Sequence, residues 1–116
     1  DHNVISFESV SSPTTWRYWS DGNEVAVTLR SHLSVNTIDA AIDAGLAGAG
    51  VVRTVSYQVA DYARDGLLQL LLAAYEPNPR PVHLVYYKQN RLPLKLRAFV
   101  DFVVPRLRDR LTAIAL

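Results

Sequence analysis

Short apolar segments alternate with amphipathic ones along this chain. We expect strands in seven segments, at residues 4–7, 16–19, 24–30, 32–35, 51–55, 67–72 and 82–87. Each is continuously apolar or changes between apolar and polar side chains at every second position, as strands do. We expect helices at residues 37–47, 56–64 and 94–111. The alternation of strands and helices predicts an α/β fold.

The second and third of these strands form a predicted hairpin. Asp21-Gly22-Asn23 supplies the turn, because glycine tolerates positive φ and Asp or Asn side chains bond their own backbone. In the strand that follows, Val25 and Val27 alternate with smaller or polar residues, which predicts one buried face.

The first two helices have recognisable ends. Asn36 is the expected N-cap of the first helix, and Asp39, three residues later, is placed to complete a capping box. Gly66 is a natural left-handed residue for the end of the second helix. Between the two helices, the glycines of residues 48–50 break the first one before the strand at residues 51–55.

The last helix has an apolar face and a proline in its interior. Its apolar side chains recur at helical spacing, so the helix needs a partner surface. Pro105 lacks the N–H that would bond the carbonyl of Asp101, which predicts a kink there or an end near Val104. Basic residues exceed acidic ones in residues 95–116. This excess either complements the helix dipole or contacts nucleic acid.

Composition describes an ordinary globular domain. Of 116 residues, 49% are hydrophobic and 20% charged, and the formal net charge of +1 offers no overall footprint for nucleic acid. The chain has no cysteine and no apolar run of the roughly 20 residues that a membrane span requires. We therefore expect a cytoplasmic protein with no membrane contact. Because the chain begins with Asp1 and a strand-like segment follows almost at once, we expect a piece of a longer protein.

Catalytic patterns are absent from the sequence. The glycines at residues 45–50 follow a helix and precede a strand, which is the reverse of a dinucleotide-binding turn. His2, His32 and His83 have no metal-ligand spacing, and no G-x-S-x-G nucleophile elbow occurs. We expect no enzyme, no metal and no cofactor.

Two polar segments are candidate binding sites. The loop after the first strand contains several hydroxyl side chains, and it is either a ligand cradle or a solvated connection. Asn36 and Thr37 stand at a helix start, where backbone N–H groups and the dipole favour an anion, or else they simply cap the helix. In α/β sheets, ligands bind at the carboxyl ends of strands, where both segments are expected.

Motifs along nearly the whole chain resemble one family. They are Trp16-x-Tyr18, Asp21-Gly22, Val25-x-Val27, Leu33-x-Val35-Asn36-Thr37, Ala47-Gly48-Ala49-Gly50-Val51, Ser56-Tyr57-Gln58-Val59, Gly66-x-Leu68, Pro81-Val82-x-Leu84-Val85-Tyr86 and Arg97-Ala98-Phe99-Val100-Asp101-Phe102. Their joint order and spacing resemble the effector-binding region of LysR-type transcriptional regulators. The resemblance implies a periplasmic-binding-protein type 2-like (Rossmann-like) lobe, with a mixed sheet flanked by helices, plus a C-terminal helix.

The resemblance also implies how the chain is divided and where it binds. Residues 1–87 would be most of the second regulatory lobe, and residues 88–116 a return segment and helix that belong to the first lobe. The effector would bind between the lobes. The positions carried over as effector-binding are Phe7, Ser9, Ser11, Thr14, Asn36, Thr37 and Val55. Many relatives have Leu-Pro in place of Thr54-Val55 and Pro in place of Tyr87, so the loops at these positions are expected to differ.

The implied function is regulatory. A small-molecule effector shifts the relative orientation of the lobes, and this changes how a homo-oligomer presents its DNA-binding heads. These heads are the N-terminal winged helix-turn-helix domains, which lie outside this sequence. A fragment of an extracytoplasmic solute-binding protein would share the fold and stays open as an alternative, as does an enzyme fragment that receives its catalytic group from elsewhere.

Overall fold

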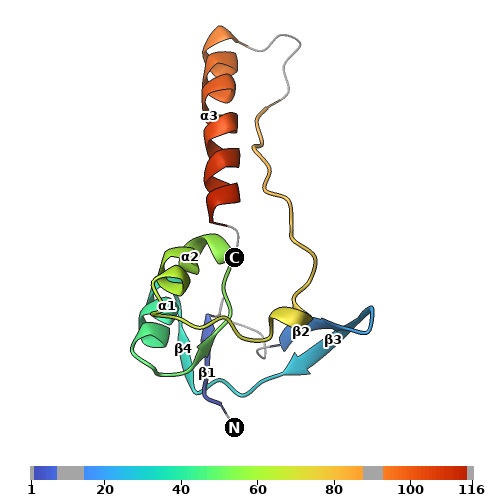
Figure 1. Cartoon of the computed structure of the whole chain (residues 1–116), viewed down its shortest axis with the longest axis vertical. Helices are drawn as coiled ribbons and strands as arrows, with labels where there is room; N and C mark the ends of the chain where they lie inside the picture. Colours follow the sequence, from blue (N-terminus) through green and yellow to red (C-terminus); the bar gives the residue numbers. More distant parts are fainter. Residues whose placement is uncertain (1, 8–14, 88–92, 115–116) are drawn as a thin grey trace. The chain divides into compact units, whose positions relative to one another are not determined.

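The computed structural model describes residues 2–7, 15–87 and 93–114 (Figure 1). The chain divides into two compact units, residues 1–78 and residues 79–116. The first unit contains all the strands of the described residues, and the second contains the long C-terminal helix.

A parallel three-stranded sheet is the centre of the first unit. Strand β1 (Val4–Phe7) lies between β4 (Leu33–Val35) and β5 (Val51–Val52). Ile5 of β1 is opposite Leu33 on one side and Val52 on the other. Because β1 is bonded on both sides, Val4, Ile5 and Ser6 are buried. A parallel sheet joined through helices makes this unit α/β, as the sequence predicts.

Helix α1 (Ile38–Leu46) covers this sheet and contacts all three of its strands. Ala41 and Ile42 are its buried residues, so the apolar face predicted for this helix meets the sheet. Gly45 permits a close approach, because a Cβ there would lie 3.1 Å from Cγ2 of Val52. The core is therefore built from β1, α1 and the start of β5.

The predicted hairpin is present as a separate two-stranded sheet. Strands β2 (Thr15–Ser20) and β3 (Asn23–Thr28) pair antiparallel. Asp21 and Gly22 form the two-residue turn with φ values of 51° and 78°, the positive values that hairpin turns with a matching twist require. The buried face predicted for β3 is wrong, since all six of its residues are exposed. Parallel and antiparallel pairs both occur, but they lie in two separate sheets.

The start of α1 differs from the prediction by one residue. Thr37, and not Asn36, is the N-cap, and its Oγ1 accepts a hydrogen bond from the N–H of Ala40 at 3.2 Å. The predicted capping box of Asn36 with Asp39 is therefore wrong. Two adjacent residues each able to cap cannot be separated by sequence, because the choice depends on which one adopts the extended backbone before the first turn.

Strand β5 is shorter than predicted, and helix α2 matches its prediction. β5 ends at Val52 instead of Val55, because residues 53–55 leave the ladder before α2 (Ser56–Arg64) begins. Gly66, with a φ of 75°, follows the end of α2 in the left-handed conformation expected of it.

Two predicted strands do not form among the described residues. Residues 67–72 are irregular and lead into the short 3-10 helix η1 (Ala73–Tyr75), before which Leu72 has a left-handed φ of 60°. Residues 82–87 are likewise unpaired, and Val85 is 87% exposed. Both segments are apolar, and residues 82–87 have β propensity as well, but a strand forms only where a neighbouring strand accepts its backbone hydrogen bonds.

Helix α3 (Leu94–Ala113) forms most of the second unit and continues through Pro105 (Figure 1). The predicted end near Val104 is wrong. The turn around the proline retains other contacts, since Arg106 Nη1 donates to the carbonyl of Phe102 at 2.9 Å and its guanidinium lies over the Phe102 ring. No residue within α3 is buried. Its apolar side chains therefore lack a complete partner surface in this unit.

Candidate functional site

The carboxyl edge of the parallel sheet brings together several positions that the sequence singled out. Phe7 ends β1 and pairs with Val35, the last residue of β4. Asn36 and Thr37 follow β4 directly and lead into α1. Residues 53–55 follow β5 and lead into α2. Because the strands are parallel, the starts of both helices lie at this one edge.

The side chains at this edge are accessible. Phe7 is 51% exposed and Val55 is 47% exposed, and Asn36 and Thr37 are exposed as well. An exposed aromatic ring beside polar side chains is the mixture that a small-molecule site requires. The other three predicted positions, Ser9, Ser11 and Thr14, lie outside the described residues.

The two helix starts at this edge differ in how they are capped. In α1 the hydroxyl of Thr37 occupies one backbone donor, and Asp39 adds a negative charge in the first turn. In α2 the N-cap residue is Val55, which makes no side-chain capping bond, and the first turn has no acidic residue. The N–H of Gln58 in this turn donates to the carbonyl oxygen of Val55 at 3.0 Å. The N–H groups before it, which Val55 leaves uncapped, and the positive end of the dipole are offered to solvent or to a ligand.

Sequence reasoning missed two residues beside Val55. Arg53 Nη2 donates to the carbonyl oxygen of Arg17 at 2.9 Å, and its guanidinium carbon lies 5.6 Å from the ring centre of Tyr18. Thr54 Oγ1 donates to Oε1 of Gln58 at 2.6 Å, in the first turn of α2. The available signal was Arg53, a charged residue that interrupts the β-branched run predicted to be a strand at residues 51–55.

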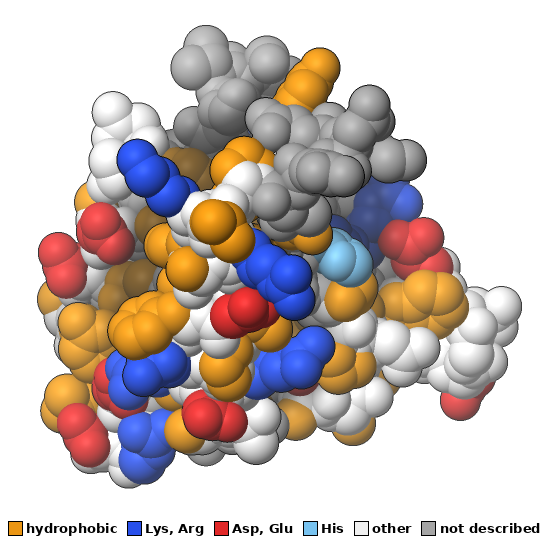
Figure 2. Space-filling model, turned by 90° about the horizontal axis from the view of Figure 1, so that it is seen from above, with side chains coloured by type: hydrophobic (Ala, Val, Ile, Leu, Met, Phe, Trp, Pro, Cys, Tyr) orange, Lys and Arg blue, Asp and Glu red, His pale blue; other side chains and the backbone are white. Residues whose placement is uncertain are grey.

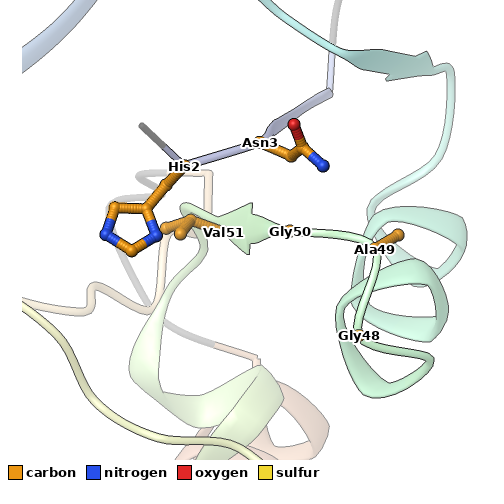
Figure 3. Close-up of a pocket in the computed structure, with 6 residues that line it drawn as sticks. All are labelled: His2, Asn3, Gly48, Ala49, Gly50 and Val51. Atoms are coloured by element: carbon orange, nitrogen blue, oxygen red, sulfur yellow. The ribbon is translucent and has the colours of Figure 1, made fainter.

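A hollow of about 340 Å³ lies at the opposite, amino edge of the sheet. Its lining residues are His2, Asn3, Gly48, Ala49, Gly50 and Val51 (Figure 3). The side chains of His2 and Asn3 point in different directions, and the other residues form the connection from α1 to β5 (Figure 3). Side chains that do not converge provide no defined ligand geometry, so this hollow is a weaker candidate than the carboxyl edge.

The described part of the chain offers no metal centre, because it contains no group of three or more His, Cys, Asp or Glu side chains able to hold an ion. Basic and acidic side chains are interspersed among apolar ones on the face shown in Figure 2.

None of the helices in the described ranges combines the length and the apolar content that a membrane span requires.

Comparison with known proteins gives a consistent set of relatives. An HTH-type transcriptional repressor of Pseudomonas aeruginosa is 28% identical over 109 residues, which cover 90% of this chain and 34% of the relative. The HTH-type transcriptional regulator PgrR of Escherichia coli is 30% identical over 103 residues, covering 87% of this chain and 34% of the relative. The HTH-type transcriptional regulator CrgA of Neisseria meningitidis is 28% identical over 112 residues, covering 95% and 37%.

The chain spans about a third of the length of these relatives. No solved structure gives a significant match. The family described as "LysR substrate binding domain" matches residues 1–108, nearly the whole sequence. This match agrees with the α/β unit and its accessible carboxyl edge, and with relatives that are HTH-type regulators. The chain belongs to the LysR substrate-binding domain family.

Proposed function

We propose that this chain is the ligand-sensing part of a LysR-type DNA-binding transcriptional regulator, and that it binds a small-molecule effector. The family match over residues 1–108 carries the proposal. The relatives named above are transcriptional regulators, which favours this role over a solute-binding protein or an enzyme fragment.

The proposed effector site is the carboxyl edge of the parallel sheet. Phe7 supplies an exposed aromatic surface at the end of β1. Asn36 and Thr37 add polar groups at the start of α1, and Val55 lies beside the uncapped start of α2. Polar groups of an effector would accept hydrogen bonds from backbone N–H groups of α2, and its apolar part would cover Phe7 and Val55. Ser9, Ser11 and Thr14 belong to the proposal through the family resemblance alone.

The site is proposed to be completed by a further lobe. In this arrangement residues 1–87 form the second lobe, and residues 88–116 contribute a helix to the first. The exposure of α3 supports it, because Phe99 is 54% exposed and Leu107 is 44% exposed. Burying a side chain of this size contributes about 1.5–3 kcal/mol, so a partner surface for α3 would stabilise the assembled domain.

Regulation is proposed to proceed by a population shift. An effector held between two lobes favours one relative orientation by its difference in affinity for the two states. In a homo-oligomer that change would alter the spacing of N-terminal winged helix-turn-helix heads on DNA. A coupling of about 1–3 kcal/mol between effector and DNA corresponds to about 5- to 150-fold in DNA affinity.

The test is a thermal-shift screen of small metabolites on the full-length protein, followed by DNA binding with each compound that stabilises it. A compound at 100 times its Kd adds about 2.7 kcal/mol to the stability of the protein. The proposal fails if no compound stabilises the protein, or if stabilising compounds leave DNA affinity and footprint unchanged.

A matched pair of variants locates the site. Val55→Tyr adds bulk at the carboxyl edge, and Val25→Tyr adds the same bulk on the hairpin, where the valine is similarly exposed. We expect Val55→Tyr to lose most of the compound's stabilisation and Val25→Tyr to keep it. Equal responses of the two variants would place the effector away from this edge.

A further inference from the structure

Arg53 connects the hairpin to the end of β5. Its Nη2 donates to the carbonyl oxygen of Arg17 in β2 at 2.9 Å, and its guanidinium carbon is 5.6 Å from the ring centre of Tyr18. The side chain of Arg17 does not compete for these contacts, since it pairs with Glu24 across the hairpin at 3.1 Å. Arg53 is thus the donor in a contact between two segments 36 residues apart in the sequence.

The next residue connects the end of β5 to α2. Thr54 Oγ1 donates to Oε1 of Gln58 at 2.6 Å, and Gln58 lies in the first turn of the helix. Gln58 also donates its N–H to the carbonyl oxygen of Val55 at 3.0 Å. Arg53 and Thr54 therefore link the hairpin on one side to the start of α2 on the other.

The strand β3 contributes little to holding the hairpin in place among the described residues. All six residues of β3 are exposed. Figure 1 shows the hairpin projecting away from α1 and α2, and β2 contacts the short helix η1. A two-stranded hairpin is at best marginally stable by itself. A side chain that ties the hairpin to the residues after β5 therefore contributes to holding it in position.

We propose that Arg53 is a positioning residue that couples the β2–β3 hairpin to the effector site at the start of α2. The coupling to an effector rests on the proposed function, whereas the holding of the hairpin does not. An effector that contacts the start of α2 restrains residues 53–55, and the guanidinium of Arg53 passes this restraint to Arg17 and Tyr18. The hairpin is then part of the conformational response although it contributes no residue to the site.

The hairpin contains its own spectroscopic probe. Trp16 and Trp19 lie in β2, and they are the two tryptophans of this sequence. In the full-length protein, any tryptophan outside these 116 residues is replaced by phenylalanine, so that fluorescence reports the hairpin alone. Acrylamide quenching then measures how freely the hairpin departs from the position that Arg53 holds.

The first experiment compares ligand-free variants. R53A is expected to raise the population of displaced hairpin about fivefold, as for loss of one solvent-exposed hydrogen bond of ordinary strength, and so to increase quenching. R53K keeps the charge without the planar fork and is expected to fall between R53A and the wild type. R64A is the matched control, because the ion pair of Arg64 is with Asp61 within α2.

Loss of the fold in a variant must be distinguished from displacement of the hairpin alone. Far-UV circular dichroism and the unfolding midpoint are therefore measured for each variant. If R53A fails to fold, R53Q replaces it, because glutamine keeps hydrogen-bond donors on a shorter neutral side chain. Quenching of R53A or R53Q equal to that of the wild type and R64A overturns the proposal. Increased quenching with partial recovery in R53K supports it.

The second experiment tests the coupling, using any compound that the thermal-shift screen identifies. In the wild type and R64A, the compound is expected to raise the unfolding midpoint and to change the tryptophan emission. In R53A, the midpoint still rises while the emission change falls at least about fivefold, in line with a lost coupling of ordinary size. A full emission response in R53A overturns the proposal, and so does loss of stabilisation, which would make Arg53 a ligand contact.

The two proposals fail in different ways. If no compound stabilises the wild type, the effector function fails, and the ligand-free quenching still decides whether Arg53 holds the hairpin. If compounds stabilise the wild type while quenching is unaffected in R53A, the positioning role of Arg53 fails alone.

Discussion

Replacing Gly50 by alanine should separate β5 from β1. Gly50 has a φ of 157°, which residues with side chains rarely adopt, and it immediately precedes β5. An added Cβ would lie 2.4 Å from the carbonyl oxygen of Asn3 and 2.9 Å from its carbonyl carbon. A carbon–oxygen contact normally stays beyond about 3.3 Å, so the backbones must move apart by close to 1 Å.

The cost follows from what that movement disturbs. The neighbour is backbone and cannot rotate away, so overpacking contributes about 1–3 kcal/mol. The same Asn3 oxygen accepts the N–H of Val51 at 2.8 Å, and weakening this bond costs about 1 kcal/mol. We therefore expect Gly50→Ala to lower the free energy of unfolding by about 2–4 kcal/mol, a large share of the 5–15 kcal/mol typical of a domain.

Gly48→Ala is the matched control for this change. Gly48 is two residues away and has a φ of 78°, but a Cβ there would have no atom within 4 Å. We expect about 1–2 kcal/mol from the left-handed backbone alone. Both variants restrict the unfolded chain equally, so their difference reports the contact with Asn3 together with the difference in backbone strain between the two φ values.

The assay is urea unfolding at 25 °C followed by far-UV circular dichroism, with equal slopes required before midpoints are converted to free energies. A cost for Gly50→Ala no larger than that for Gly48→Ala would refute the reasoning. It would mean that β1 and β5 approach less closely here than the structure has them.

Three further predictions concern other parts of the chain. Thr37→Ala should lower the free energy of unfolding by about 1 kcal/mol through loss of the α1 cap, while Asn36→Ala should cost much less; equal costs in urea unfolding would contradict the assignment of the cap. Gly22→Val should destabilise the hairpin by about 1–3 kcal/mol, because a β-branched residue strains the positive φ of the turn; tryptophan quenching like that of the wild type would argue against this. The 116-residue chain should self-associate through the exposed face of α3, and Phe99→Ser with Leu107→Ser should reduce this in sedimentation; a wild type that stays monomeric at high concentration would count against it.

Local features of this protein are readable from the sequence because they depend on neighbouring residues. The hairpin turn needs only Asp21 and Gly22, whose preferences allow positive φ. Helix α2 begins and ends where the pattern predicts, and Gly66 takes its left-handed conformation. In each case the residues that determine the structure lie within a few positions of it.

Features that depend on distant partners are not readable in this way. Residues 67–72 and 82–87 are apolar segments of strand length, yet the described structure supplies no strand to pair with them. Helix α3 continues through Pro105 although the local rule predicts an interruption. A residue's propensity states what it tolerates, and whether a strand or a buried face forms depends on the surface that meets it.

The candidate site also combines features that the sequence predicts with features that depend on tertiary structure. The sequence by itself singled out the start of α1 and, through family resemblance, Phe7 and Val55. That these positions share one edge was decided by the parallel register of β1 and β4, which pairs Phe7 with Val35. The contacts of Arg53 are visible only in the folded chain, because its partners, Arg17 and Tyr18, lie about 35 residues away in sequence and are brought to it by tertiary packing.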